Sequence, residues 1–587
     1  MNLNEIKKTL FRHFDIPQVS QVEAVIKKFS FAEKIVFWFF GIFLTLGTLG
    51  ILNTINESFM IEVPAKGGEI TEGCVGLPRF VNPLLAISNA DNDVVSLVYS
   101  GLMKTDLDGD LIPDLAEEYN ISDDGLVYTF KIRDDAFFHD GAPVTAEDIE
   151  WTIKLSLDNL IKSSKRANWD GIKTEIIGSK EIRFTLKTPY SPFLENTTLG
   201  ILPKHIWGQM ALEQFAFSEF NVQPIGSGPY KIIGVKKNSS GIIEEFDLKA
   251  FDKYTLGEPY ITNLKIKFYP NEESLVNGYK KGEVKNINSI SPEIAKELEK
   301  NKTKIKKIPL PRIFGVFFNQ NQNQIFADTN VRKALNISLD KEKIVNQVLN
   351  GYGIPINNPV PNTSKYFDSS IKKEEYNLEK GIEILEKDSW KLRESGVREK
   401  TVKKKTTQLS FTISTSDAPE LKAVANLLKE DWEKLGAKVT IKIFEIGDLN
   451  QNTIRPREYD CLLFGEIIGR DMDLFAFWHS SQRNDPGLNI AMYANTTVDK
   501  LLEETRSIND EKKRSEKFEK IQQEIIKDTP AVFVYSPEFI YVMPDEIKNL
   551  SLNQITTPAE RFLDIHNWYI KTNSLWKIFN SKQKINN

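Results

Sequence analysis

The sequence predicts an α/β protein of several domains that follows a single membrane-spanning helix. Three observations lead to this prediction. At 587 residues the chain is too long for one hydrophobic core, so two to four domains are expected. Residues 35–56 hold no charged side chain. Residues 409–441 combine a strand, a helix, a closing glycine and a second strand, which is the order typical of βαβ units.

Composition places the rest of the chain among ordinary soluble proteins. Hydrophobic residues make up 41% and charged residues 27% of the chain, and the net charge of −5 gives no reason to expect nucleic acid as a partner. Cys74 and Cys461 lie far apart in the sequence. We expect two isolated buried thiols rather than a disulfide framework.

The apolar segment 35–56 fits a membrane anchor. As a helix rising about 1.5 Å per residue it would be roughly 33 Å long, enough to cross a bilayer core. Six basic residues precede it: Lys7, Lys8, Arg12, Lys27, Lys28 and Lys34. This charge bias places residues 1–34, an amphipathic segment interrupted by Pro17, in the cytoplasm, and everything after the helix outside. A cleaved signal peptide is the alternative, but its basic region is usually much shorter than 34 residues.

Residues 99–151 are the most informative part of the exported chain. Three Asp-Gly pairs mark turns between apolar runs, at positions 108–109, 124–125 and 140–141. Residues 126–133 alternate apolar and polar side chains like a half-buried strand. Thr145, followed by two acids, has the pattern of a helix N-cap. These local rules predict an α+β module with hairpins.

The order of these pieces resembles the signature block of the family 5 extracellular solute-binding proteins, which are the oligopeptide, dipeptide and nickel receptors of ABC importers. The family pattern has a Pro-Asp-Leu-Ala-Glu run, an Asp-Gly-Leu-x-Tyr-x-Phe strand, a Phe-His-Asp-Gly turn and a helix opening Thr-Ala-Glu-Asp. The matching residues here are 113–117, 125–130, 138–141 and 145–148. Residues 225–230 and 331–341 resemble two later family elements.

The resemblance implies a two-lobed periplasmic-binding-protein type II fold, in which an extra α+β domain is inserted into lobe I. The expected division of the chain is a cytoplasmic segment 1–34, an anchor 35–56, a stalk 57–66, lobe I formed by 67–91, 222–305 and 536–587, an inserted domain 92–221, and lobe II from 306 to 535. A hinge between the lobes would close around a ligand.

No catalytic or metal-binding motif stands out in the sequence. The five histidines are never within ten residues of one another, and there is no HExxH, CxxC, P-loop or GxSxG motif. The acids Asp106, Asp108 and Asp110 resemble a calcium loop, but Leu111 stands where that loop needs glycine. We therefore expect turn acids there, no cofactor, and a protein that is not an enzyme.

Three segments are candidates for a ligand cleft by resemblance. The first is residues 76–83, where Arg79 could pair with a carboxylate and Asn82 with an amide; a surface arginine and an Asn-Pro turn explain the same residues equally well. The second surrounds residues 317–319, and the third covers 459–478 with 489–493. The predicted ligand-binding residues are Arg79, Asn82, Phe317, Asn319, Phe464, Glu466, Asp471, Asp473, Asn489 and Tyr493.

The third segment departs from the family pattern. Peptide receptors of the family carry an Asp shortly before an Asp-Pro-Asp-x-Phe motif, and that Asp meets the ligand's α-ammonium group. Here residues 471–475 resemble the motif with Met472 in place of proline, and the expected Asp falls on Ile468. Glu466, two residues earlier, would share the face of Ile468 on a strand. We therefore expect Glu466 or Asp471 to contact a ligand cation.

The resemblance implies a membrane-anchored, monomeric receptor that captures peptides or peptide-like solutes outside the membrane. It would deliver them to an ABC permease and its ATPase. A ligand sensor or peptide-holding chaperone coupled to residues 1–34 is the alternative, followed by an exported hydrolase that reuses the fold. Nickel and heme are also ligands within the family. The scarcity of histidine near the candidate segments argues against direct nickel ligation and leaves chelated metal open.

Overall fold

The computed structural model describes residues 18–580 apart from 372–373, 471 and 509. The chain forms two compact units. The first combines the described parts of Met1–Ala65 and Thr572–Asn587, and the second is Lys66–Lys571. Pro17, where the sequence predicted a helix break, lies outside the described residues.

The first unit is built around α3 (Phe31–Phe59), a 29-residue helix with no buried residue. Ser30 caps it, because the Ser30 hydroxyl oxygen accepts from the Glu33 backbone N–H at 3.4 Å, while the Ser30 backbone N–H donates to the Glu33 carboxylate at 2.8 Å. Of the described helices, α3 alone is long and apolar enough to cross a membrane. It extends the predicted segment 35–56 at both ends. The remaining elements of this unit are α2 (Val19–Lys27), β1 (Met60–Ala65), β23 (Lys571–Trp576) and α19 (Lys577–Asn580).

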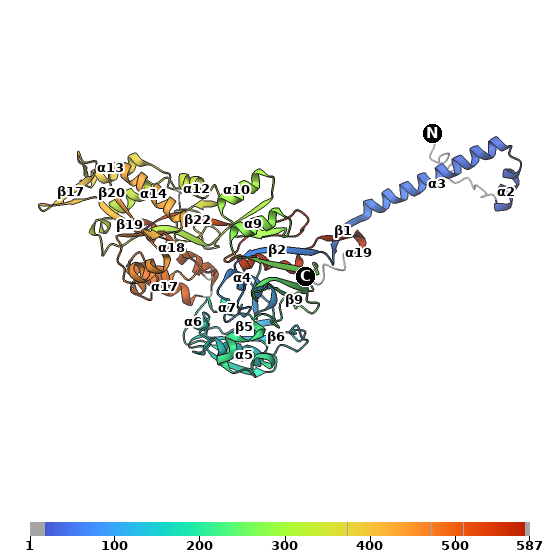
Figure 1. Cartoon of the computed structure of the whole chain (residues 1–587), viewed down its shortest axis with the longest axis horizontal. Helices are drawn as coiled ribbons and strands as arrows, with labels where there is room; N and C mark the ends of the chain where they lie inside the picture. Colours follow the sequence, from blue (N-terminus) through green and yellow to red (C-terminus); the bar gives the residue numbers. More distant parts are fainter. Residues whose placement is uncertain (1–17, 372–373, 471, 509, 581–587) are drawn as a thin grey trace, which may run out of the picture. The chain divides into compact units, whose positions relative to one another are not determined.

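The second unit is organised by one mixed sheet of twelve strands (Figure 1). Its centre is β22 (Ala531–Val542), which is buried along most of its length. The first half of β22 pairs with β14 (Arg312–Phe318), and the second half pairs with β12 (Asn286–Asn288) and β13 (Ile305–Pro309). One strand therefore runs through both halves of the sheet.

On one side of β22 the sheet continues through strands of predicted lobe I. These are β2 (Glu69–Val75), β11 (Asn263–Tyr269), β10 (Ile243–Ala250) and β9 (Tyr230–Lys237). β2 runs parallel to both β11 and β12, while β9 and β10 form an antiparallel pair. The helix α4 (Asn89–Val98) packs its apolar side chains into the core of this half.

On the other side of β22 lie the strands of predicted lobe II. β14 pairs with β21 (Cys461–Ile467), which is followed by β19 (Ser410–Ser416) and β20 (Lys438–Phe444). The predicted βαβ unit is present, because α14 (Pro419–Lys434) connects the parallel strands β19 and β20. Gly436 closes the helix with φ +92°, a conformation that side chains with a Cβ resist. Two separate apolar cores flank this half-sheet.

The predicted α+β module forms a four-stranded antiparallel sheet with its own core. Its strands are β5 (Ala116–Ile121), β6 (Val127–Ile132), β8 (Glu181–Thr185) and β7 (Lys173–Gly178). The helix α5 (Ala146–Ser156) begins where Thr145 predicted it, with the Thr145 backbone N–H donating to Asp148 at 2.8 Å. The three Asp-Gly turns are confirmed, since Gly109, Gly125 and Gly141 all have positive φ.

Two smaller sequence expectations can also be checked. Cys74 and Cys461 are free and buried, which confirms two isolated thiols. Asp106 uses its carboxylate in a turn, where it accepts from the backbone N–H groups of Asp108 and Asp110 at 3.0 and 2.9 Å. The division into lobes and insert stays a prediction, although β22 changes sheet partners close to the predicted boundary at residue 536.

Candidate functional site

The loop after β21 lies where predicted lobe II meets the rest of the second unit. Arg470 forms an ion pair with Glu560, which belongs to the C-terminal part of predicted lobe I. Asp473 pairs with Arg506 at 3.1 Å and accepts a hydrogen bond from Tyr190 of the predicted inserted domain at 3.3 Å. The predicted ligand residue Asp473 is thus engaged in contacts across this junction.

Glu466 is the predicted site residue with the most unusual environment. It is 4% exposed, and neither carboxylate oxygen has a hydrogen-bond partner among the residues that the structure describes. It stands opposite Ile313 in the β14–β21 register, in a stretch of largely apolar strand. Burial raises the pKa of this carboxyl well above its ordinary value. A ligand cation at this position would supply the partner that the described residues do not.

The neighbours of Glu466 on β21 are apolar. Phe464, two residues earlier on the same face, is half-buried. It packs against the apolar core that contains the fully buried Phe317. Ile468, at the position of the family's ammonium-binding Asp, is also fully buried. The structure therefore gathers Phe317, Phe464 and Glu466 on one sheet face. Asp471, the other predicted cation partner, lies outside the described residues.

The two predicted residues after β2 have different environments. Arg79 is exposed and stacks its guanidinium over the Phe80 ring, 4.9 Å from the centroid. Asn82 is fully buried, and its side-chain oxygen accepts from the Leu84 backbone N–H at 2.9 Å. These are the surface arginine and the Asn-Pro turn that the sequence offered as the alternative. Ligand contact by either residue stays a prediction.

Asn319, Asn489 and Tyr493 are buried and hold loops together. The Asn319 amide donates to the Arg457 carbonyl at 2.9 Å. Asn489 accepts from the Tyr493 backbone N–H at 3.1 Å and donates to the Tyr493 carbonyl at 2.9 Å. The Tyr493 hydroxyl donates to Asp528 at 2.7 Å, and burial raises its pKa. These contacts favour a supporting role for all three side chains, and their ligand role also stays a prediction.

A cavity of about 400 Å³ next to the junction was missed by the sequence analysis. It lies between α4, β3 (Met103–Thr105) and the 3-10 helix η6 (Pro558–Phe562). Lys104 donates to the Tyr254 hydroxyl at 3.4 Å, and burial lowers the pKa of its ammonium group. Burial raises the pKa of Asp114 in the same wall. Glu560, the partner of Arg470, also lines the cavity.

One wall of this cavity is fixed by a buried ion cluster. Arg561 of η6 is 0% exposed and donates to Glu72 at 2.9 Å and to both oxygens of Asp93 at 2.7 Å. The Tyr541 hydroxyl donates to the other oxygen of Glu72 at 2.9 Å. The cluster ties η6 to β2, α4 and β22. Its members are scattered over 490 positions of the sequence, so no local pattern signals it.

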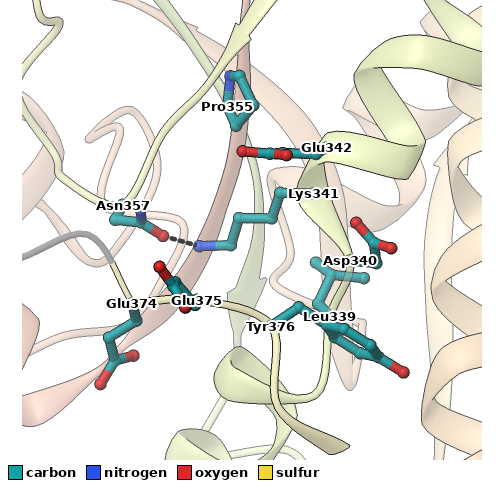
Figure 2. Close-up of a pocket in the computed structure, with 9 residues that line it drawn as sticks. All are labelled: Leu339, Asp340, Lys341, Glu342, Pro355, Asn357, Glu374, Glu375 and Tyr376. Carbon is teal, nitrogen blue, oxygen red and sulfur yellow. Dashed lines mark hydrogen bonds between the residues drawn. The ribbon is translucent and has the colours of Figure 1, made fainter.

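A second pocket, of about 370 Å³, lies in predicted lobe II and has a different character (Figure 2). Lys341 points into it and donates to Asn336 at 3.2 Å, to the Ile356 carbonyl at 3.1 Å and to Asn357. Acidic side chains such as Glu374 and Glu375 also line the pocket. None of the ten predicted ligand residues lines this pocket. Within the described part of the chain, no group of His, Cys, Asp and Glu is placed to hold a metal ion.

Comparison with known proteins gives one consistent result. The family model for bacterial extracellular solute-binding proteins, family 5 Middle, matches residues 110–486. The oligopeptide-binding protein AppA of Bacillus subtilis is 31% identical over 517 residues, which cover 86% of this chain and 92% of that protein.

Solved structures agree with the sequence comparison. Bacillus subtilis AppA, in complex with a nonapeptide, matches with a TM-score of 0.65 and 30% identity, over 87% of this chain and 100% of that one. The substrate-binding protein CtaP of Listeria monocytogenes matches with a TM-score of 0.72 and 26% identity, over 86% and 99%. The α/β two-lobed fold class predicted from the sequence is confirmed.

Proposed function

We propose that this chain, which belongs to the family 5 bacterial extracellular solute-binding proteins, is a membrane-anchored receptor for peptides or peptide-like solutes. The receptor closes around its ligand and delivers it to an ABC permease and ATPase. The observation that carries the peptide assignment is Glu466, a buried carboxyl that has no partner among the described residues and lies in the half-sheet next to the junction. A peptide ammonium group satisfies such a carboxyl.

Closure is supported by the way the two half-sheets are joined. β22 is shared between them, so small changes of φ and ψ near residue 536 can rotate one half against the other. The ion pair between Arg470 and Glu560 and the contacts of Asp473 join the loop after β21 to other parts of the second unit. Contacts of this kind stabilise a closed form, and ligand affinity depends on the difference between the closed and open forms.

The cavity beside α4 suits the opposite charge of a peptide. Lys104 makes a long hydrogen bond of 3.4 Å to Tyr254, and it is attracted to the carboxylates of Asp114 and Asp564. This ammonium group can form an ion pair with a ligand carboxylate. The protein then binds through non-covalent contacts alone, with no bond broken in the ligand. The family consists of solute-binding proteins, and this membership supports the non-enzymatic role that we propose for the chain.

The proposed anchor determines on which side of the membrane the binding unit lies. With residues 1–34 held in the cytoplasm by their basic side chains, α3 crosses the membrane once and the second unit lies outside. The relative AppA of Bacillus subtilis carries the name of an oligopeptide-binding protein, which agrees with a peptide as the ligand class. We propose that the receptor acts as a monomer.

Native mass spectrometry of the full chain, released from nanodiscs, tests this function. We expect a co-purified peptide mixture that disappears after denaturation and refolding without ligand. Adding a random peptide library should restore bound mass and raise the melting temperature. If neither free peptides nor their N-acetylated forms shift the melting temperature, the peptide assignment is wrong. A rise in melting temperature with unfolded proteins but not with short peptides would favour the chaperone alternative.

A further inference from the structure

The C-terminal end of the chain returns to the membrane anchor. β23 pairs with β1, the strand that directly follows α3. The Trp576 indole N–H donates to the Asn56 side-chain oxygen at 2.8 Å. The Trp576 ring stacks on Phe59 with a centroid distance of 6.2 Å and an interplanar angle of 26°. Asn56 and Phe59 belong to the last turn of α3, so Trp576 is fixed to the end of the apolar helix.

The contact leaves a group of large apolar side chains in solvent. Phe59 is 52% exposed, Trp576 is 41% exposed and Ile578 is 66% exposed. Lys577, between the last two, is exposed as well. An aromatic ring with one polar end, apolar neighbours and an adjacent cation is the combination enriched at the boundary between lipid chains and headgroups. In a soluble protein the same group would be an unexplained apolar patch.

We propose that β23 (Lys571–Trp576) is the second strand of a two-stranded stalk, and that the end of this strand together with the start of α19, at Trp576–Ile578, inserts into the headgroup layer where α3 leaves the bilayer. The occupant of this apolar surface is the lipid bilayer itself, because the surface is continuous with a 29-residue helix whose side chains are all unburied. This inference rests on the proposed membrane anchor and adds a second membrane contact to it.

The stalk has a consequence for the receptor. The chain enters the second unit at Lys66 and leaves it at Lys571. Gly67 and Lys571 are neighbours there, since a Cβ on Gly67 would lie 3.0 Å from the Lys571 side chain. Two paired strands therefore connect the binding unit to the anchor. We expect this connection to allow less rotation than the single linker of an N-terminal anchor alone.

Depth measurements on the full chain in nanodiscs test the proposal. Single cysteines carrying the fluorophore NBD are placed at Ile578→Cys, Asn573→Cys and Gly47→Cys, and lipids with a nitroxide near the headgroup or deep in the chain act as quenchers. Cys74 and Cys461 are buried, and unsubstituted protein gives their background labelling. Gly47 lies within α3 and has nothing within 4 Å of an added Cβ, so the substitution fits.

We expect shallow nitroxide lipids to quench the dye at position 578 at least threefold more than the dye at 573. Asn573 is the matched control, because it is exposed on the same strand and lies about 10 Å from Trp576 at the usual rise per residue. Trp576→Ala should lower quenching at 578 to the level at 573, while the melting-temperature shift with peptides stays unchanged. If Ile578→Cys itself reduces the melting-temperature shift with peptides, Lys577→Cys is used as the labelling site instead.

The possible outcomes distinguish a failure of the proposed C-terminal membrane contact from a failure of the proposed anchor. Deep quenching at Gly47 together with equal quenching at 578 and 573 would keep the anchor and overturn the membrane contact of the C-terminal segment. No quenching at Gly47 would overturn the anchor and this inference together, and would leave the peptide-binding result intact. Strong quenching at 578 that persists in Trp576→Ala would show that the indole does not position the tip.

Discussion

Two buried charged sites in the second unit differ in one respect, namely whether the protein supplies the counter-charge. The Arg561 guanidinium donates to the carboxylates of Glu72 and Asp93, and a tyrosine hydroxyl donates to the other oxygen of Glu72, so every charged group of this cluster is paired. Glu466 is buried to a similar degree and has no partner among the described residues. Burying a charge is costly unless it is paired, so the paired cluster stabilises the fold, whereas we propose that the unpaired carboxyl of Glu466 serves ligand binding.

The largest expected effect comes from breaking the satisfied site. Arg561→Met leaves Glu72 and Asp93 buried without their cation, and we expect the free energy of unfolding to fall by about 3–5 kcal/mol. Urea unfolding followed by circular dichroism measures this change. The control is Lys304→Met, whose ion pair with Asp545 is exposed; it should change stability by less than about 1 kcal/mol. Similar effects for both variants would contradict the comparison.

The next largest effect should come from Glu466, and on binding rather than on folding. Glu466→Gln keeps the shape and removes the charge, so peptide affinity should fall roughly 10- to 100-fold, the loss of one charge-assisted hydrogen bond of about 1.5–3 kcal/mol. At a pH below the folded-state pKa of Glu466, where the wild-type carboxyl is neutral, the urea midpoint without ligand should stay within error of wild type. Isothermal titration calorimetry measures the affinity. Glu458→Gln, an exposed glutamate just before β21, is the control; an equal loss there would remove the special role of Glu466.

The pH dependence sharpens this result. Burial raises the folded-state pKa of Glu466 above its unfolded value, so the neutral carboxyl is favoured in the ligand-free protein. Its contribution to stability is complete below the unfolded pKa and is lost as pH rises through the folded pKa. Relative to Glu466→Gln, the ligand-free wild type should therefore lose stability across that window.

Ligand binding should show the opposite trend. A peptide cation favours the ionised carboxyl, so wild-type affinity should increase with pH across the same window and binding should release protons. Calorimetry in two buffers of different ionisation enthalpy counts those protons. Glu466→Gln should bind without this pH dependence. A wild type whose affinity is flat with pH would mean that Glu466 does not meet the ligand cation.

Sequence reasoning predicted the local elements well and the site only in outline. The Asp-Gly turns, the Thr145 helix start and the βαβ unit closed by Gly436 are confirmed because each depends on neighbouring residues. Glu466 could be placed on a strand face by alternation, but its lack of a partner depends on β14 and on the core beneath it. The Arg561 cluster and the Lys104 cavity join residues hundreds of positions apart, which no periodicity reveals.

The smallest expected effect concerns the junction that separates the two sites. Arg470 is largely buried in its ion pair with Glu560, and this pair joins the loop after β21 to the wall of the Lys104 cavity. Arg470→Met should lower peptide affinity about 3- to 10-fold by weakening the closed form, a coupling of about 1 kcal/mol. A double-mutant cycle with Glu560→Gln, measured by calorimetry, isolates the pair. Additive losses would show that the two residues act independently. If the coupled loss appears as faster ligand release with an unchanged association rate, the interaction between Arg470 and Glu560 acts in the closed state. In that state it would connect the half-sheet that carries Glu466 to the half-sheet that carries the Arg561 cluster.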